Sequence, residues 1–165
     1  MGKVITPDFS RGRLNGPVLP ALGSKMSVEQ ILSAARYQGC IDVIFPFITS
    51  ANFPTGKIEH VREYLTFDHM VTRSQLIGVE FPQRGVRPAT AAEMLYDYVI
   101  NHDVLWHVRL MVALGQLWKN DGQQYAVSIK HRDNACLVEP HHAGPDELFG
   151  TLWQYPVVLL DKPAA

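Results

Sequence analysis

Residues 104–114 carry the strongest structural signal in the chain, because apolar side chains occupy every second position. The odd positions are mixed, and the even positions hold Val104, Trp106, Val108, Leu110, Val112 and Leu114. Alternation with a period of two is typical of a β-strand with one buried face. We therefore expect the even face of this strand, including Trp106 and the later Trp118, to lie in the core.

Two turn signals continue this strand into an antiparallel meander. Asp121-Gly122 follows the first strand, and this dipeptide favours a two-residue hairpin turn. The return strand, residues 124–130, alternates again, and a turn at 131–134 leads to a third strand at 135–140. Residues 153–163 predict a final strand that closes the sheet.

Capping boxes mark the starts of two helices. Ser27 precedes Gln30 by three positions, and each side chain can bond the backbone of the other. Thr90 stands in the same relation to Glu93. The first helix should end at Gly39, which suits a left-handed cap. The expected fold class is α+β, with an antiparallel meander of about four to five strands packed against two or three helices.

Three further segments are assigned from their composition. Residues 40–49 are rich in β-branched and aromatic side chains and predict a buried strand, whose internal proline places it at an edge or bulge. Residues 74–81 predict another strand. Residues 57–70 are compatible with a helix or with a strand. The helix is favoured by outward charges at Glu59, Arg62 and Glu63.

The N-terminal segment differs from the rest of the chain. Residues 1–26 alternate glycines with prolines and carry a surplus of basic side chains, which predicts an irregular arm. Such an arm is either draped loosely over the surface or docked on a partner. Residues 27–165 are expected to form a single α+β domain, because 165 residues suit one domain.

Charge and hydropathy limit the functional classes. Fifteen basic residues against 16 acidic ones leave a net charge of −1, so no global field favours nucleic acid. A local patch remains as a nucleic-acid hypothesis, formed by Arg11, Arg13, Arg84 and Arg87. The N-terminus lacks an apolar signal core, and no run reaches the roughly 18 apolar residues that a membrane span needs. We therefore expect a cytoplasmic protein.

The densest group of chemically capable side chains lies at residues 137–150, where His141 and His142 are adjacent. Neighbouring side chains of an extended segment point to opposite sides, so these two imidazoles are poorly placed to bind one ion. A metal site is therefore not favoured, and it would need a third ligand such as His131 from a neighbouring strand. Residues 144–148 predict the start of a short helix with acids in its first turn.

A second group, residues 130–136, places a histidine, an aspartate and Cys136 close together. Cysteine, histidine and an orienting acid form the arrangement of a thiol nucleophile. The same residue types also suit a tight turn between strands, and we interpret the segment as that turn. Cys40 and Cys136 are expected to be reduced core thiols, because nothing indicates a secreted disulfide framework.

A small-molecule hypothesis rests on the mixed face of the first meander strand. His107 and Arg109 lie on that face, and Tyr125 lies on the return strand. If the face borders a cleft, the imidazole and the guanidinium can hold an anionic ligand together with a nearby acid. His107, Arg109 and Tyr125 are therefore the candidate ligand-binding residues. His102, on the apolar face of the second helix, is interpreted as a core histidine.

The common catalytic and cofactor motifs are absent. The chain contains no Walker-type phosphate loop, no G-x-G-x-x-G after a strand, no C-x-x-C, no H-E-x-x-H and no G-x-S-x-G. Nucleotide-dependent and zinc-protease chemistries are thereby disfavoured. We expect no cofactor, and no catalytic residue is assigned.

The helix and meander together carry a resemblance. The segments "RPATAAEMLYDYVINH", "VALGQLW" and "DGQQYAVSI" resemble a pattern in small uncharacterised bacterial proteins of mobile elements such as prophages and integron cassettes. The resemblance covers roughly residues 87–130 and carries no catalytic residue. It implies a bacterial accessory protein.

Two functional hypotheses follow. The first is a cytoplasmic accessory or binding protein that acts through protein contacts, as a homodimer or with another protein partner. The second is a small-molecule-binding protein or enzyme with a sheet-lined pocket near His107 and Arg109. A buried concave pocket lined by these polar groups would favour the second hypothesis over the first.

Overall fold

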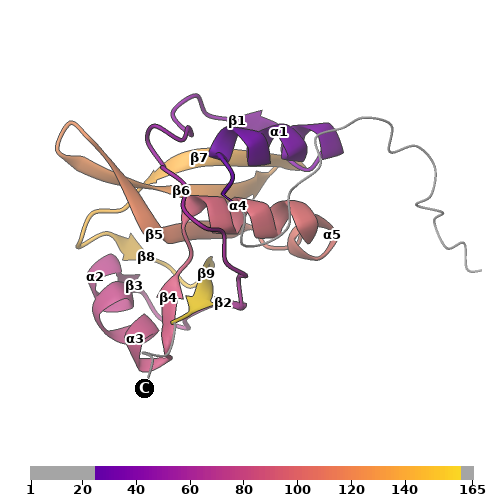
Figure 1. Ribbon diagram of the computed structural model, residues 1–165. Coiled ribbons are helices and arrows are strands. Elements are labelled where there is room, and N and C mark those ends of the chain that lie inside the picture. The colour runs from indigo at the N-terminus through magenta and orange to yellow at the C-terminus, as the bar shows by residue number, and fades with distance from the viewer. Residues whose placement is uncertain (1–24, 161–165) are drawn as a thin grey trace, which may run out of the picture.

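The computed structural model describes residues 25–160 (Figure 1). The predicted N-terminal arm therefore lies almost entirely outside the described residues. The helical elements are α1 (Val28–Gln38), α2 (Arg73–Gln75), the π-helical η1 (Leu76–Glu80), α3 (Phe81–Gln83), α4 (Ala91–Ile100) and α5 (His102–Leu105). The strands are β1 (Val43–Ile44), β2 (Glu63–Leu65), β3 (Val71–Thr72), β4 (Val86–Pro88), β5 (Leu110–Asn120), β6 (Gln123–Arg132), β7 (Ala135–His142), β8 (Leu148–Phe149) and β9 (Trp153–Leu159).

The main sheet is mixed, and the predicted antiparallel meander is wrong as a description of it. Seven strands take the order β1-β7-β6-β5-β9-β2, with β4 also paired to β9. β5, β6 and β7 are antiparallel neighbours, but β1 joins β7 in parallel and β9 joins β5 in parallel. A tight turn between two strands indicates that they pair antiparallel. Parallel strands are joined by long connections, so the sequence near each strand does not indicate its parallel partner.

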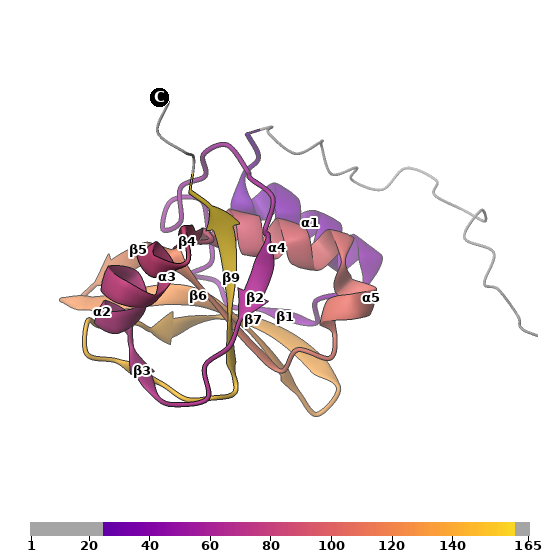
Figure 2. The ribbon, with the colours of Figure 1, turned by 90° about the horizontal axis from the view of Figure 1, so that it is seen from below.

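The predicted final strand is present as β9, but it lies between β5 and β2 in the sheet. Its first two residues pair with β5, at Leu110↔Trp153 and Met111↔Gln154. The strand then leaves β5 and pairs antiparallel with both β2 and β4. Figure 2 shows β9 running across the other strands, with β2 beside it. The C-terminal strand is thus an internal member of the sheet.

Both faces of the central strands are buried. On one face, α1 and α4 pack over residues such as Met111, Val127 and Ile129. On the other face, Val112 and Ala126 pack against a second cluster that contains aromatic side chains from η1–α3, β8 and β9. Figures 1 and 2 show α1 and α4 side by side, with α2 and α3 at a distance from them. This double burial explains why both sets of alternating positions in the first half of β5, residues 110–114, are apolar.

The two predicted capping boxes are confirmed. The Ser27 side chain accepts a hydrogen bond from the Gln30 backbone, and α1 ends at Gly39 with a φ of 71°. Thr90 and Glu93 make the same pair of bonds at the start of α4. Both predicted hairpin turns also occur, and left-handed backbone conformations are found at Asp121 and Asp133.

Residues 74–81 are helical, so the predicted strand there is wrong. Thr72 and Gln75 form a third capping box, and α2, η1 and α3 follow it without a break. Gly85, with a φ of 67°, lies just beyond the helical segment. The β-branched and aromatic composition indicated a strand, but the cap and the terminal glycine specify a helix.

Other boundaries also differ from the predictions. The favoured helix at 57–70 is instead extended and contains β2, and the predicted strand at 40–49 is reduced to the two residues of β1. The helix expected at 144–148 does not form, because a turn there leads directly into β8. β5 begins at Leu110 rather than near 104, because α5 extends to Leu105 and a turn follows it. Within residues 25–160, no helix is long and apolar enough to span a membrane.

Candidate functional site

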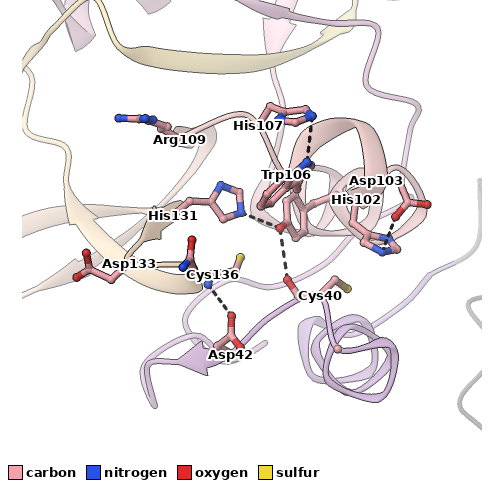
Figure 3. A pocket seen from close by; sticks show the side chains of 13 residues that line it. Cys40, Asp42, His102, Asp103, Trp106, His107, Arg109, His131, Asp133 and Cys136 are labelled. Carbon is pink, nitrogen blue, oxygen red and sulfur yellow. Dashed lines mark hydrogen bonds and ion pairs between the residues drawn. The ribbon is translucent and has the colours of Figure 1, made fainter.

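A pocket of about 730 Å³ lies at the end of the sheet where β6 turns into β7 (Figure 3). The α1–β1 connection contributes Cys40 and Asp42, and α4 contributes Tyr98. The segment from α5 to β5 supplies side chains from 102 to 109, and the β6–β7 hairpin supplies those from 131 to 136. Four segments that are distant in sequence therefore meet around one cavity.

His131 and Tyr98 form the inner part of the pocket. The Nδ1 atom of His131 lies 2.6 Å from the carbonyl oxygen of Val108, and its Nε2 atom lies 2.8 Å from the Tyr98 hydroxyl. Because a carbonyl can only accept, Nδ1 carries a proton and donates it. Nε2 is hydrogen-bonded to the tyrosine hydroxyl, which also donates to the Cys40 carbonyl over 3.3 Å. Both ring nitrogens are satisfied, so the ring orientation is fixed.

The two thiols lie beside Tyr98, and both cysteines are buried and free. The Cys136 thiol hydrogen-bonds the Tyr98 hydroxyl, while the Cys136 backbone N–H donates to Asp42 over 2.6 Å. Burial raises the pKa of the Cys136 thiol to about 11, and the Asp42 carboxylate acts in the same direction. The Cys40 thiol donates to the Ala35 carbonyl, and burial raises its pKa too. Neither thiol is an activated nucleophile at neutral pH.

The mouth of the pocket carries two unused donors. The indole N–H of Trp106 donates to Nε2 of His107 over 3.0 Å, so His107 holds its own proton at Nδ1. Within residues 25–160, that Nδ1–H has no partner, and the guanidinium of the exposed Arg109 has none either. A planar guanidinium and an imidazole N–H are suited to binding a carboxylate or a phosphate.

Carboxylates line other parts of the same pocket. Asp103 pairs with His102 at 3.0 Å, so His102 is not the core histidine that the sequence predicted. Asp42 bonds the Cys136 backbone. Asp133, on the hairpin turn, makes no side-chain bond within the described part of the chain. The pocket thus carries both charge signs.

The three candidate ligand-binding residues are not brought together as a set. His107 and Arg109 both line the pocket, whereas Tyr125 does not. Tyr125 lies near the other end of the β5–β6 hairpin, where its ring is 5.6 Å from that of Trp118 and its hydroxyl donates to Gln123. Trp106, predicted to be core, is 57% exposed beside His107, because the chain there is not yet part of β5.

His141 and His142 lie in β7 and make separate sets of contacts. His141 packs 4.6 Å from the ring of Trp153, and His142 pairs with Glu147 at 2.6 Å. Burial, with Lys130 second, lowers the pKa of His141 to about 4. His131 bonds Tyr98 and Val108 instead of approaching the pair. No cluster of three potential metal ligands occurs among residues 25–160.

The arginines of the nucleic-acid hypothesis that fall in the described region are already paired. Arg87 binds the buried Glu93 with two hydrogen bonds of 2.8 and 2.7 Å and also approaches Glu59. Arg84 pairs with Glu80 one helical turn away and lies over the Phe67 ring. Arg11 and Arg13 lie outside the described residues.

Several pocket residues had no signal in the sequence. Tyr98 lies in the helix that the Thr90 capping box predicts, and Cys40 and Asp42 lie in the segment 40–49 that predicts a buried strand. The Cys–His–Asp group at 130–136 was interpreted as a turn. The turn is present, at Asp133 and Asn134, but His131 and Cys136 also face the cavity. The alternation of β6 and β7 contained part of this information, because cross-strand partners His131 and Cys136 are adjacent.

Fold and site together define a mixed α/β protein with a polar pocket at one end of its sheet. A scan against protein-family models finds no match, and searches of curated proteins and of solved structures find no significant similarity. The resemblance to accessory proteins of mobile elements therefore stays a prediction.

Proposed function

We propose that this protein binds a small molecule with an anionic group in the pocket at the β6–β7 end of the sheet. One observation carries the proposal: the Arg109 guanidinium and the His107 Nδ1–H both lie unpartnered at a pocket of about 730 Å³. That volume is within the range of small-ligand sites, about 300–1,000 Å³. His131 and Tyr98, which are hydrogen-bonded to each other, support a defined inner wall.

Ligand-observed NMR against a library of small carboxylates and phosphates tests the proposal. Compounds that give a saturation-transfer signal with the wild-type protein should give a much weaker signal with the Arg109→Gln variant. Arg132→Gln is the matched control. Arg132 is exposed at the end of β6 and is not among the residues that line the pocket. An absence of binders, or equal binding to both variants, would contradict the proposal.

Contact with a second protein or with a second copy of the chain stays a competing prediction. The observation that favours it is the exposure of apolar side chains next to the pocket, with Val104 72% and Trp106 57% exposed. Apolar surface of this kind is often covered by a partner. Light scattering coupled to gel filtration should then give a dimer mass that Val104→Asp returns to the monomer value. A monomeric mass for the wild type would remove the homodimer hypothesis.

A further inference from the structure

The charges around the pocket do not suit a simple anion. The residues that line the pocket include one arginine, Arg109, and three aspartates, Asp42, Asp103 and Asp133. Only Asp103 has a histidine partner. A ligand that carried negative charge alone would gain one favourable ion pair and meet repulsion from the remaining carboxylates.

The histidines at the inner wall and the mouth are already hydrogen-bonded to the protein. Nδ1 of His131 donates to the Val108 carbonyl, and its Nε2 is bonded to the Tyr98 hydroxyl. Nε2 of His107 accepts from the Trp106 indole, so only Nδ1 of that ring is open to a ligand.

The unpaired charges of opposite sign are neighbours in the fold. The backbone N–H of His131 donates to the Arg109 carbonyl over 3.0 Å, which holds Arg109 opposite His131. Asp133 follows His131 by two positions, on the hairpin turn. In the view of Figure 3, Arg109 and Asp133 lie on the same side of the pocket with His131 between them. Neither side chain has an ion-pair partner within the described residues.

We infer that the ligand is a zwitterion that carries both a carboxylate and an ammonium group, such as an α-amino acid or a short peptide. Its carboxylate is held by Arg109 and His107, and its ammonium group by Asp133. The exposed Trp106 ring at the mouth provides an apolar surface for the rest of the ligand. This inference rests on the proposed function, because it specifies the chemistry of the molecule bound in the same pocket.

Titration calorimetry with matched compounds tests the inference. L-tryptophan, indole-3-propionate and tryptamine share one ring system and differ only in which charged groups they carry, and glycylglycine adds a zwitterion without a ring. At least one zwitterion should bind more tightly than its single-charge analogues by about fivefold, the size of effect expected for one additional exposed ion pair. Failure of every zwitterion to bind at millimolar concentration would overturn the inference.

Two variants separate this inference from the proposed function. Asp133→Asn should reduce zwitterion affinity by about fivefold and leave that for indole-3-propionate unchanged or increased. Asparagine tolerates the left-handed backbone at this position, where φ is 49°. Asp121→Asn is the matched control, because Asp121 occupies the other hairpin turn with a φ of 48° and is not a lining residue. Equal binding of zwitterion and carboxylate, both lost in Arg109→Gln, would reject the zwitterion and retain the anion site.

Discussion

The Tyr98 hydroxyl is hydrogen-bonded to Nε2 of His131 over 2.8 Å, and this bond joins α4 to the inner part of the pocket. Tyr98 is 2% exposed, and its hydroxyl also contacts the Cys40 carbonyl and the Cys136 thiol. Burial, with the Cys136 thiol second, raises the pKa of Tyr98. The hydroxyl therefore stays protonated and keeps its role as a donor.

Removing this hydroxyl should destabilise the fold. Tyr98→Phe leaves Nε2 of His131 without its hydrogen-bond partner, and we expect a loss of about 1–3 kcal/mol in the free energy of unfolding, measured with urea. Tyr155→Phe is the matched control, because the Tyr155 hydroxyl is equally buried but has no hydrogen-bond partner among the described residues. That substitution should change stability by less than about 0.5 kcal/mol. Equal losses in both variants would show that the bond to His131 contributes nothing.

Gly115 occupies a position in β5 that has no room for a side chain. A Cβ atom there would lie 2.4 Å from the Pro88 carbonyl oxygen and 2.7 Å from that of Ala89. Gly115→Ala should therefore force β4 away from β5 and cost about 1–3 kcal/mol in thermal or urea unfolding. Gly78→Ala, in open space within η1, should be neutral or stabilising by up to about 1 kcal/mol. A tolerated Gly115→Ala would contradict the close approach of the two strands.

Stability should fall as the pH drops from about 6.5 towards 4 because of His141. Its pKa is lowered from 6.5 to about 4, first by burial and then by Lys130. Between pH 6.5 and 4, His141 is protonated in the unfolded chain but not in the native protein. The free energy of unfolding therefore decreases by about 1 kcal/mol for each pH unit. The stabilisation is complete above 6.5 and lost by pH 4. His141→Gln should flatten the pH profile across this window.

The matched comparison for this pH effect is His142→Gln. His142 is exposed and pairs with Glu147, whereas His141 packs against the ring of Trp153. Urea unfolding of both variants between pH 4 and 7 would separate the two neighbours. A wild-type slope that survives His141→Gln unchanged would assign the pH dependence to other groups.

The thiols should be slow to react in the native protein. Both cysteines are buried, and the pKa of Cys136 is raised to about 11. An aromatic disulfide reagent at neutral pH should therefore label native protein slowly, and denatured protein rapidly at two sites. No titratable thiol in denaturant without reductant would instead reveal a disulfide. Rapid labelling of the native protein would show that the pocket activates a cysteine.

Local signals in the sequence predicted the local parts of the fold. The capping boxes at Ser27 and Thr90 each involve only four residues, and the Asp121-Gly122 turn involves two. The same capping pattern occurs at Thr72, but residues 74–81 were predicted as a strand from their composition alone. That error shows that hydrogen-bond capping can override composition in a short apolar segment.

Non-local features were not predictable in the same way. The parallel pairings of β1 and β9 join segments that no tight turn connects. The pocket depends on contacts of the same kind, since Tyr98 is 33 positions from His131 and 58 from Cys40. His107 and Arg109 were identified from the mixed face of one strand. Tyr125 was included because it lies on the neighbouring strand. It pairs with Trp118 near the turn of the β5–β6 hairpin, whereas the pocket lies at the other end of these strands.

Amide chemical-shift mapping tests the central claim that this pocket is a ligand site most directly. The best binder from the carboxylate and phosphate library would be titrated into ¹⁵N-labelled protein. The account predicts saturable shifts for amides around His107, Arg109, His131 and Asp133, and their loss in Arg109→Gln. Shifts that cluster instead around Tyr125, His142 and Glu147, or that persist in Arg109→Gln, would contradict it.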